Sequence, residues 1–271
     1  YSQVRRDQPR RNFLMVDGRA VYIEDKGTGE PLVLLHGFGE STYSWRKIVL
    51  ALSAHYRTLA IDLYGFGWTE RPTDPAAYSR DGQLRMITSV MDALGIESAT
   101  VVGHSYGGAL ALALAVLEPQ RVRALVLIDS ASPSYPDSRK SLVAGSGVLA
   151  RLALPFALSK GSIRRSLRGA FFDDDLATAE LARAYRKRLA VEGVLEAYHH
   201  LSAPPPSPGP AIDVAKIRQP ALFLWGADDH VISLRDAREG AALMPTSEFV
   251  TIPRCGHAPA EERPEAVLAA M

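Results

Sequence analysis

The sequence predicts an α/β protein in which a mostly parallel, doubly wound sheet is interrupted by an inserted helical cap. Three observations lead to this prediction. Short apolar runs of strand length alternate with helix-like stretches over residues 1–131, a pattern typical of a parallel sheet with helices on both faces. The alternation stops over residues 132–212, which hold helix-like, charged segments, and it resumes over residues 213–271. We therefore expect one core in two parts, 1–131 and 213–271, with residues 132–212 as the cap.

The first part of the core begins with a predicted hairpin. The runs NFLMV and AVYIED are separated by an Asp-Gly turn at Asp17, and Asp-Gly between apolar runs is a hairpin signal. Buried parallel strands are expected at Pro31–Gly37, Tyr56–Leu63, Ser98–Gly103 and Val122–Ser130, and helices at Trp45–Ala54, at Arg80–Leu94 and after Ser105.

The helical insertion and the second part of the core follow. The insertion ends in APPPSPGP (Ala203–Pro210), which is too rich in proline for the interior of a helix or a sheet. The strand pattern resumes at Pro220–Gly226 and Ser247–Pro253, and a final helix is expected up to Met271.

Composition and charge narrow the class of protein. The 271 residues carry a formal net charge of +1, so no nucleic-acid partner is expected, because such a partner requires a basic surface. The basic runs Val4–Asn12 and Ile163–Arg168 are interpreted as solvated surface. Cys255 is the single cysteine, which excludes an intrachain disulfide and a zinc cluster of cysteines. The longest apolar run, Ala109–Leu117, is well short of the roughly 18 residues that a membrane-spanning helix needs.

The sequence implies no metal and no cofactor. The glycine-rich stretch Gly27–Pro31 precedes a predicted strand rather than a helix, so it is interpreted as a turn and not as a phosphate-binding loop. These residues do not specify the oligomeric state. A cytoplasmic location is slightly favoured, and a removed N-terminal signal or anchor is the alternative because the chain starts at Tyr1 rather than Met.

The stretch GHSYG, Gly103–Gly107, carries the strongest chemical signal. It fits G-x-S-x-G and stands after a predicted strand and before a predicted helix, which is the context that a nucleophile elbow requires. Such a sharp turn exposes the serine hydroxyl above the sheet, and small flanking residues avoid a clash with strand and helix. Ser105 is therefore the candidate nucleophile. The alternative is a plain glycine-rich turn between a strand and a helix.

A serine nucleophile needs a base, and the base needs an acid that fixes its tautomer. On the fold that carries this motif, the order along the chain is Ser, then Asp or Glu, then His. His257, in CGHAPAEERPE after the last predicted strand, is the candidate base, whereas His230 is interpreted as a surface or pocket-edge group. Asp228 and Asp229 follow a buried strand in WGADD and compete as the acid, and Asp229 is preferred.

Other residues complete the candidate site. Asp129, at the end of ALVLID, is a third candidate acid but is interpreted as a helix or loop cap. A tetrahedral intermediate needs backbone N–H groups around its oxyanion. Tyr106 follows the nucleophile and supplies one amide, and Phe38 in HGFG supplies the other. His36, in the same loop, is interpreted as a residue that stabilises the loop by hydrogen bonding.

Together these stretches resemble the α/β-hydrolase-fold proteins with a cap domain, in particular serine hydrolases of the carboxylesterase type. The matching stretches run in family order from Leu34 to Glu265: LLHGFGES, IDLYGFGWTERP, VVGHSYGGALAL, VRALVLIDSA, ALFLWGADDHVIS and IPRCGHAPAEERPE. The family's acid usually lies third after the glycine of the stretch matched by WGADD, which favours Asp229. The resemblance implies a full set of site residues: nucleophile Ser105, base His257, acid Asp229, and oxyanion donors Phe38 and Tyr106.

Serine at the elbow directs the expected reaction. Haloalkane dehalogenases and epoxide hydrolases of this fold carry aspartate there, and Ser105 cannot form their alkyl-ester intermediate. The expected function is hydrolysis of a carboxylic ester through an acyl-enzyme on Ser105. The alternatives are hydrolysis of a carbon–carbon bond in dienoic ketones from ring cleavage, by enzymes that usually have smaller residues in the oxyanion loop, and a cofactor-free perhydrolase, with an aminopeptidase ranked lower. A small-molecule receptor on the same fold is the non-enzymatic alternative.

The expected partner is a small-molecule ester. Trp45 and Val231, and the ring of Tyr106, are predicted to line its pocket because they flank the predicted catalytic loops. The aromatic residues of the cap are a second set, for which the cap's own core is at least as good an interpretation: Phe171, Phe172, Tyr185, Tyr198, His199 and His200.

Overall fold

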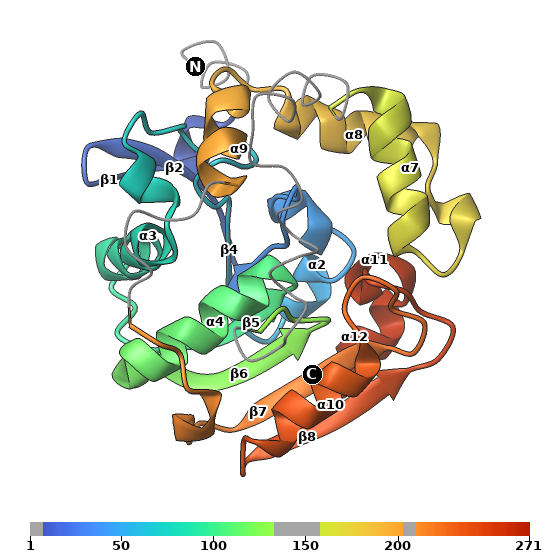
Figure 1. Ribbon diagram of the computed structural model, residues 1–271. Coiled ribbons are helices and arrows are strands. Elements are labelled where there is room, and N and C mark those ends of the chain that lie inside the picture. Colours follow the sequence, from blue (N-terminus) through green and yellow to red (C-terminus); the bar gives the residue numbers. More distant parts are fainter. Residues whose placement is uncertain (1–7, 133–157, 203–209) are drawn as a thin grey trace.

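The computed structural model describes residues 8–132, 158–202 and 210–271 (Figure 1). The strands are β1 Phe13–Val16, β2 Arg19–Lys26, β3 Pro31–Leu35, β4 Arg57–Ile61, β5 Ala99–His104, β6 Val122–Ile128, β7 Ala221–Gly226 and β8 Ser247–Ile252. The α-helices are α2 Val49–Leu52, α3 Arg80–Ala93, α4 Tyr106–Leu117, α7 Lys160–Ala170, α8 Ala179–Leu189, α9 Val194–Ser202, α10 Leu234–Ala242, α11 Pro259–Glu262 and α12 Pro264–Ala270. Short 3-10 turns occupy η1 Arg10–Asn12, η2 Thr42–Trp45, η3 Pro75–Tyr78, η4 Pro119–Arg121, η5 Asp174–Leu176 and η6 Val214–Lys216.

The eight strands form one sheet in the order β1-β2-β4-β3-β5-β6-β7-β8. The pairs β1–β2 and β2–β4 are antiparallel, and every later pair is parallel. The predicted mostly parallel sheet is therefore confirmed. His104 pairs with Ile128, and Ile128 pairs with Leu224, so β5, β6 and β7 end side by side. The residues that follow these three strands meet at this edge, where open α/β sheets bind their ligands.

Helices cover both faces of the sheet (Figure 1). Val33 and Leu35 of β3 belong to the core cluster that includes side chains of α3, α4 and α10. Leu32 and Leu34 point the other way, into the cluster formed with α2 and α12. A strand buried on both faces has no polar side, which explains why PLVLL reads as one continuous apolar run.

The predicted N-terminal hairpin is confirmed. Val16 pairs with Arg19 across a two-residue turn. Both turn residues have positive φ angles, 49° at Asp17 and 75° at Gly18, which is the conformation of the turn that Asp-Gly favours.

The segment after β3 differs from the single helix predicted for Trp45–Ala54. A 3-10 turn occupies Thr42–Trp45, and α2 begins only at Val49. Ser41 caps the 3-10 turn by accepting the N–H of Tyr43 at 3.3 Å, and the Ile48 N–H still bonds three residues back, to Trp45. Hydrogen bonds of the i to i+3 type thus persist to Ile48 and delay the α-helix.

The described residues between β6 and β7 form the helices α7, α8 and α9 and contain no strand. In Figure 1, α8 and α9 lie at the top and α7 at the upper right. Ser159 and Thr178 cap α7 and α8 by accepting backbone N–H groups. This agrees with the expected helical character of the insertion. Residues 133–157, and most of the proline-rich stretch Ala203–Pro210, lie outside the described residues, and the division at 131 and 212 stays a prediction.

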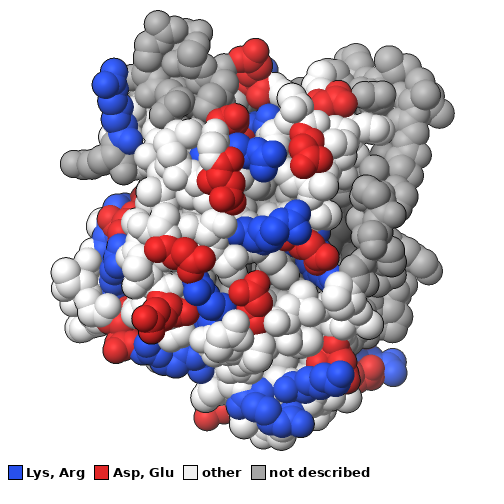
Figure 2. All heavy atoms as spheres, turned by 90° about the vertical axis from the view of Figure 1, so that its left-hand side faces the viewer, with Lys and Arg blue, Asp and Glu red and all other residues white. Residues whose placement is uncertain are grey.

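Charges of both signs are interspersed on the face shown in Figure 2. Ion pairs such as Arg57–Asp25 at 2.7 Å and Arg121–Asp92 at 2.6 Å lie at the surface. Part of the basic run Val4–Asn12 lies outside the described residues. The absence of a nucleic-acid partner stays a prediction. Among the helices that the structure describes, none is both long and apolar enough to cross a bilayer.

Candidate active site

Ser105 occupies the sharp turn between β5 and α4. Its backbone has φ 48° and ψ −114°, a conformation that L-residues rarely adopt and that costs free energy. A Cβ atom at Gly107 would overlap the carbonyl oxygen of Leu35 in the neighbouring strand, so glycine is required there. The turn presents Ser105 at the N-terminus of α4, where the partial positive charge of the helix favours developing negative charge.

The structure brings Ser105, His257 and Asp229 into one chain of hydrogen bonds. Nε2 of His257 lies 3.0 Å from Oγ of Ser105, and Nδ1 lies 2.8 Å from Oδ2 of Asp229. Because Asp229 can only accept when ionised, Nδ1 carries the proton and Nε2 is left as an acceptor. Ser105 is 3% exposed and each of the other two residues is 8% exposed. This geometry allows proton transfer from the serine hydroxyl to the imidazole.

Asp229 is held as a carboxylate. The N–H groups of Val231 and Ile232 donate to its Oδ1 at 2.7 and 3.0 Å. Burial raises the pKa of Asp229, but its hydrogen bond to His257 and the electrostatic attraction of that imidazole outweigh burial and hold the pKa below its ordinary value. Asp228, its competitor, is only partly buried, and it is Asp229 that bonds to His257, so the geometry favours Asp229.

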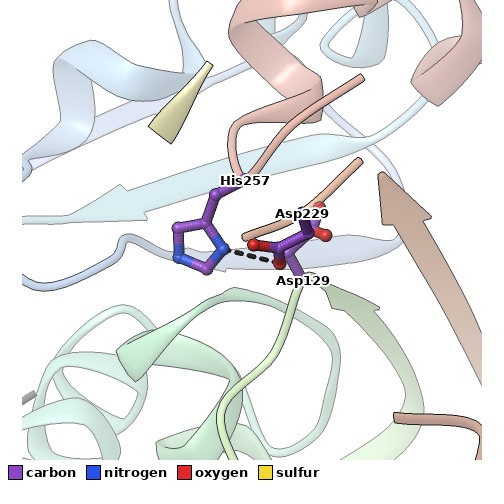
Figure 3. Close-up of side chains that lie close together, drawn as sticks. All are labelled: Asp129, Asp229 and His257. Atoms are coloured by element: carbon purple, nitrogen blue, oxygen red, sulfur yellow. Dashed lines mark hydrogen bonds and ion pairs between the residues drawn. The ribbon is translucent and has the colours of Figure 1, made fainter. Parts of the chain in front are cut away.

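Asp129 lies beside this pair, as Figure 3 shows. One ligating atom from each of Asp129, Asp229 and His257 falls within 4.8 Å of the others. Oδ1 of Asp129 accepts the Gly226 N–H at 3.0 Å, and the buried side chain also faces the carboxylate of Asp229, to which a protonated Asp129 donates a hydrogen bond. Burial and the negative charge of Asp229 raise the pKa of Asp129 well above its ordinary value. Asp129 therefore fastens β6 to the end of β7 as a neutral acid and does not cap a helix.

This acid–imidazole group is where the described residues come nearest to a metal site. Both ring nitrogens of His257 already face Asp229 and Ser105. A metal ion would have to displace one of these contacts, so the arrangement fits proton transfer better than metal ligation.

The two predicted oxyanion donors lie at the same edge of the sheet. Tyr106 is the first residue of α4, and Phe38 lies in the loop after β3. Their rings meet edge to face, with centroids 6.3 Å apart. Neither backbone N–H bonds to an acceptor among the described residues, which leaves both amides available to an oxyanion.

The loop that carries His257 is fixed through its backbone. The His257 N–H donates to the carbonyl of Ala170 at the end of α7, at 2.7 Å. Glu262 accepts the N–H of Gly256 at 3.0 Å through one oxygen and that of Phe172 at 2.7 Å through the other. The imidazole position thus depends on the contact between the core and the described helices of the insertion.

His104 and Glu40 are site residues that the sequence reasoning missed. Nδ1 of His104 lies 3.0 Å from Oε2 of Glu40, and Nε2 lies 2.7 Å from the carbonyl oxygen of His257. Both residues stand inside recognised motifs, HGFGE and GHSYG. The sequence feature that could have indicated them is that each is an ionisable residue directly beside one of the two glycine-rich turns.

The predicted pocket residues separate in the structure. Val231 lies beside Asp229 through its N–H, with its side chain partly buried against the main core. Trp45 is 1% exposed and lies in the cluster with Leu34 and Ile48, on the face of α2 and α12. The structure therefore favours a core role for Trp45 over the predicted pocket role.

The remaining histidines behave largely as the sequence suggested. His36 joins the ends of two strands, since Nε2 accepts the Leu63 N–H at 3.1 Å and Nδ1 faces the carbonyl of Gly37 at 2.8 Å. Burial lowers the pKa of His36, which fits a neutral, structural imidazole. His230 is exposed.

Two aromatic residues of the insertion reach the core. The Tyr198 ring meets Phe38 at 5.3 Å and Phe66 at 5.8 Å between centroids. Tyr185 places its hydroxyl 3.4 Å from Oγ of Ser44. The other aromatic candidates are Phe171, buried, Phe172, exposed, His200, stacked on Tyr78, and His199, beside His200. Tyr198 is thus the member of this set that meets the candidate oxyanion loop.

Comparisons with known proteins point to one fold family. The sequence profile described as alpha/beta hydrolase fold matches residues 30–264. The 2-hydroxymuconate semialdehyde hydrolase of Pseudomonas sp. (strain CF600) is 33% identical over 253 residues, which cover 90% of this chain and 86% of that protein. A 2-hydroxy-6-oxo-2,4-heptadienoate hydrolase of Pseudomonas putida is 31% identical, over 90% of this chain and 88% of its own. The crystal structure of the meta-cleavage product hydrolase CumD of Pseudomonas fluorescens IP01, with acetates bound, superposes with a TM-score of 0.77 at 27% identity, over 95% of this chain and 94% of that chain.

Proposed function

The chain belongs to the alpha/beta hydrolase fold family, and from this premise we propose that it is a serine hydrolase that attacks a carbonyl carbon with Ser105. The observation that carries the proposal is the hydrogen-bonded chain from Ser105 through His257 to Asp229, with contacts of 3.0 and 2.8 Å. His257 takes the serine proton, Asp229 holds the imidazole in the required tautomer, and the amides of Phe38 and Tyr106 bind the oxyanion.

The proposed substrate is a dienoic ketone whose carbon–carbon bond is hydrolysed. The curated relative at 31% identity is named as a hydrolase of such a ketone, 2-hydroxy-6-oxo-2,4-heptadienoate, and the one at 33% identity as a hydrolase of the related aldehyde, 2-hydroxymuconate semialdehyde. The structural neighbour at 27% identity is a meta-cleavage product hydrolase. Ester hydrolysis was the first expectation from the sequence. The comparisons favour the carbon–carbon alternative instead.

The chemistry of a 2-hydroxy-6-oxo-2,4-dienoate suits this site. Moving the enol proton from the oxygen on C2 to C5 gives a 2,6-dioxo-3-enoate. Ser105 then adds to C6 while His257 takes its proton, and the C5–C6 bond breaks. The electron pair passes from C5 through the C3–C4 double bond to the oxygen on C2, and His257 returns the proton. Water hydrolyses the remaining acyl-enzyme by the same steps.

Ester hydrolysis is the second candidate because of the bulk at the oxyanion loop. Phe38 packs edge to face against Phe66 at 5.2 Å and Tyr198 at 5.3 Å. Phe38 lies in the predicted oxyanion loop, where the resemblance implies smaller residues in carbon–carbon hydrolases, and the other two rings pack around it. An ester needs no proton transfer to carbon, so the same triad and amides suffice for it.

A side-by-side assay tests the two candidates. The purified protein is assayed with 2-hydroxy-6-oxo-2,4-heptadienoate, and the loss of absorbance of this substrate is measured. It is also assayed with p-nitrophenyl acetate and butyrate, and the release of nitrophenol is measured. We expect kcat/KM to be higher for the dienoic ketone. A higher value for the esters would favour carboxylesterase function. No turnover of either, with no labelling by a serine-reactive phosphonate, would leave the receptor alternative.

A further inference from the structure

His104 lies between two hydrogen-bond acceptors that come from different loops. Oε2 of Glu40, in the loop after β3, is 3.0 Å from Nδ1. The carbonyl oxygen of His257, in the loop after β8, is 2.7 Å from Nε2. His104 is buried and Glu40 is mostly buried, with side chains 8% and 15% exposed. Water therefore does not compete strongly for these contacts.

The acceptors decide where the protons of His104 lie. A carbonyl oxygen cannot donate, so Nε2 must carry a proton. Oε2 of Glu40 already accepts the Gly37 N–H at 2.9 Å, which fits a carboxylate, so Nδ1 donates to it. An ordinary imidazole is also more basic than an ordinary carboxylate, by about two pKa units. Both ring nitrogens are then protonated.

We propose that His104 is a buried imidazolium that acts as a positioning residue. With Glu40, it ties the loop that carries His257 to the loop that carries Phe38. The backbone of His257 is thereby held at its carbonyl by His104 and at its N–H by Ala170. The inference concerns the site of the proposed function and rests on that function only for its activity measurements.

The charges around His104 support this protonation state. Burial lowers the pKa of His104, but the charge and hydrogen bond of Glu40, the His257 carbonyl and the charge of Asp229 outweigh burial and raise it. Burial raises the pKa of Glu40, but the charge and hydrogen bond of His104, with smaller effects from the Gly37 N–H and His36, lower it to about 2. The ring of His257, whose centroid lies 5.1 Å from that of His104, is the neighbouring group that would oppose the positive charge on His104 when it takes a proton, whereas His36 is neutral because burial lowers its pKa.

The ion pair packs closely against the backbone at Gly37 and leaves no room for a side chain at that position. A Cβ atom at Gly37 would lie 2.9 Å from Nδ1 of His104 and 3.1 Å from Oε2 of Glu40. Glycine at position 37 therefore lets the ion pair close against the backbone of the oxyanion loop. The pair and the loop behave as one packed unit.

The pH dependence follows from these directions. The ionised pair requires Glu40 to be deprotonated, so its contribution is lost as pH falls toward about 2. It requires His104 to be protonated, so its contribution is complete below the ordinary histidine pKa and is lost as pH rises through the raised pKa of folded His104. Glu40→Gln removes the charge that raises this pKa and shifts the loss to lower pH.

Nitrogen NMR of protein labelled with ¹⁵N-histidine tests the protonation state without any substrate. The signal of His104 is identified by its absence from His104→Asn. In the wild type near neutral pH, we expect both ring nitrogens of His104 to have the shifts of a protonated imidazolium. In Glu40→Gln at the same pH, we expect one ring nitrogen to lose its proton. A wild-type His104 with one unprotonated nitrogen would overturn the proposal, and this measurement needs no variant to be active.

Kinetics test the positioning role. Glu40→Gln is expected to lower kcat between about 10- and 100-fold, with KM changed less than about two-fold, and to move the alkaline loss of kcat to lower pH. The matched control is Glu239→Gln, which removes a carboxylate from an exposed pair with Arg235 and is expected to change neither value. If folded Glu40→Gln loses kcat at the same alkaline pH as the wild type, the proposal is overturned. Failure of Ser105 to act as nucleophile would instead sink the proposed function and leave the NMR result standing.

Discussion

Nε2 of His257 lies 3.0 Å from Oγ of Ser105, although 152 positions separate the two residues along the chain. The contact closes because β5 and β8 both end at the same edge of the sheet, with β6 and β7 between them. Its direction is fixed by Asp229 on the opposite side of the imidazole, at 2.8 Å. Ser105 is therefore the hydroxyl whose removal should matter most.

Ser105→Ala is expected to lower kcat by about 10⁴-fold or more, because the nucleophile is lost while binding and the oxyanion amides remain. Labelling by a serine-reactive phosphonate should disappear with it. The control is Ser53→Ala, since Oγ of Ser53 donates to the Leu50 carbonyl at the surface. Equal turnover by Ser105→Ala and the wild type would show that the nucleophile lies elsewhere.

Asp229→Asn is expected to cost about 10⁴-fold in kcat, because the amide favours the wrong tautomer of His257. Asp129→Asn keeps an acceptor for the Gly226 N–H and is expected to stay within about ten-fold of the wild type. Steady-state kinetics of the two variants under one condition decides the assignment. The reverse order of losses would make Asp129 the acid.

Asp129→Asn should also stabilise the protein increasingly as pH rises. Folded Asp129 keeps its proton because its pKa is raised, whereas the unfolded chain releases that proton above a pKa of about 3.9. The wild type therefore loses stability relative to the variant with rising pH, by at most about 1.4 kcal/mol per pH unit, until pH passes the raised pKa. Urea unfolding of both proteins at several pH values measures the difference. A difference that does not change with pH would mean that folded Asp129 is ionised.

Gly107→Ala is expected to lower the free energy of unfolding by about 1–3 kcal/mol, because its new Cβ atom would overlap the Leu35 carbonyl. Turnover should fall as well, since the elbow would have to shift. Gly161→Ala is the matched control, as a Cβ atom at Gly161 in α7 meets nothing within 4 Å. Chemical unfolding of both variants checks the contrast. Equal stability of both would show that the elbow relaxes without cost.

The parts of the fold and site that depend on local sequence could be predicted. The continuous apolar run of β3, the Asp17–Gly18 turn and the strand–serine–helix order around Ser105 each have a local physical cause, and the structure contains all of them. The choice of Asp229 over Asp228 rests instead on the resemblance to the α/β-hydrolase fold, in which the acid usually lies third after the glycine of the stretch matched by WGADD. The structure places it next to His257, as that preference required.

The parts that depend on distant contacts could not be predicted. Trp45 stands next to the oxyanion loop in sequence, but the 3-10 turn from Thr42 directs it into the core of the opposite face. The pairing of Glu40 with His104 joins positions 64 apart. Asp129 was expected to cap a local element, yet it faces Asp229 because β6 and β7 are neighbours in the sheet. Contacts between residues at the ends of different strands depend on the strand order, which no local sequence pattern indicates.

The strand order also determines when the active site can assemble while the chain is being synthesised on the ribosome. Domains generally fold from the N-terminal side while the chain is still being made, and Ser105 follows β5 at the middle of the sheet. The strands up to β6 can pair and form the elbow before His257 has been translated. The hydroxyl of Ser105 then has no base beside it until β7 and β8 have joined the sheet. Because of this strand order, Ser105 of a nascent chain is not activated as a nucleophile. It becomes reactive in one of the last steps of folding.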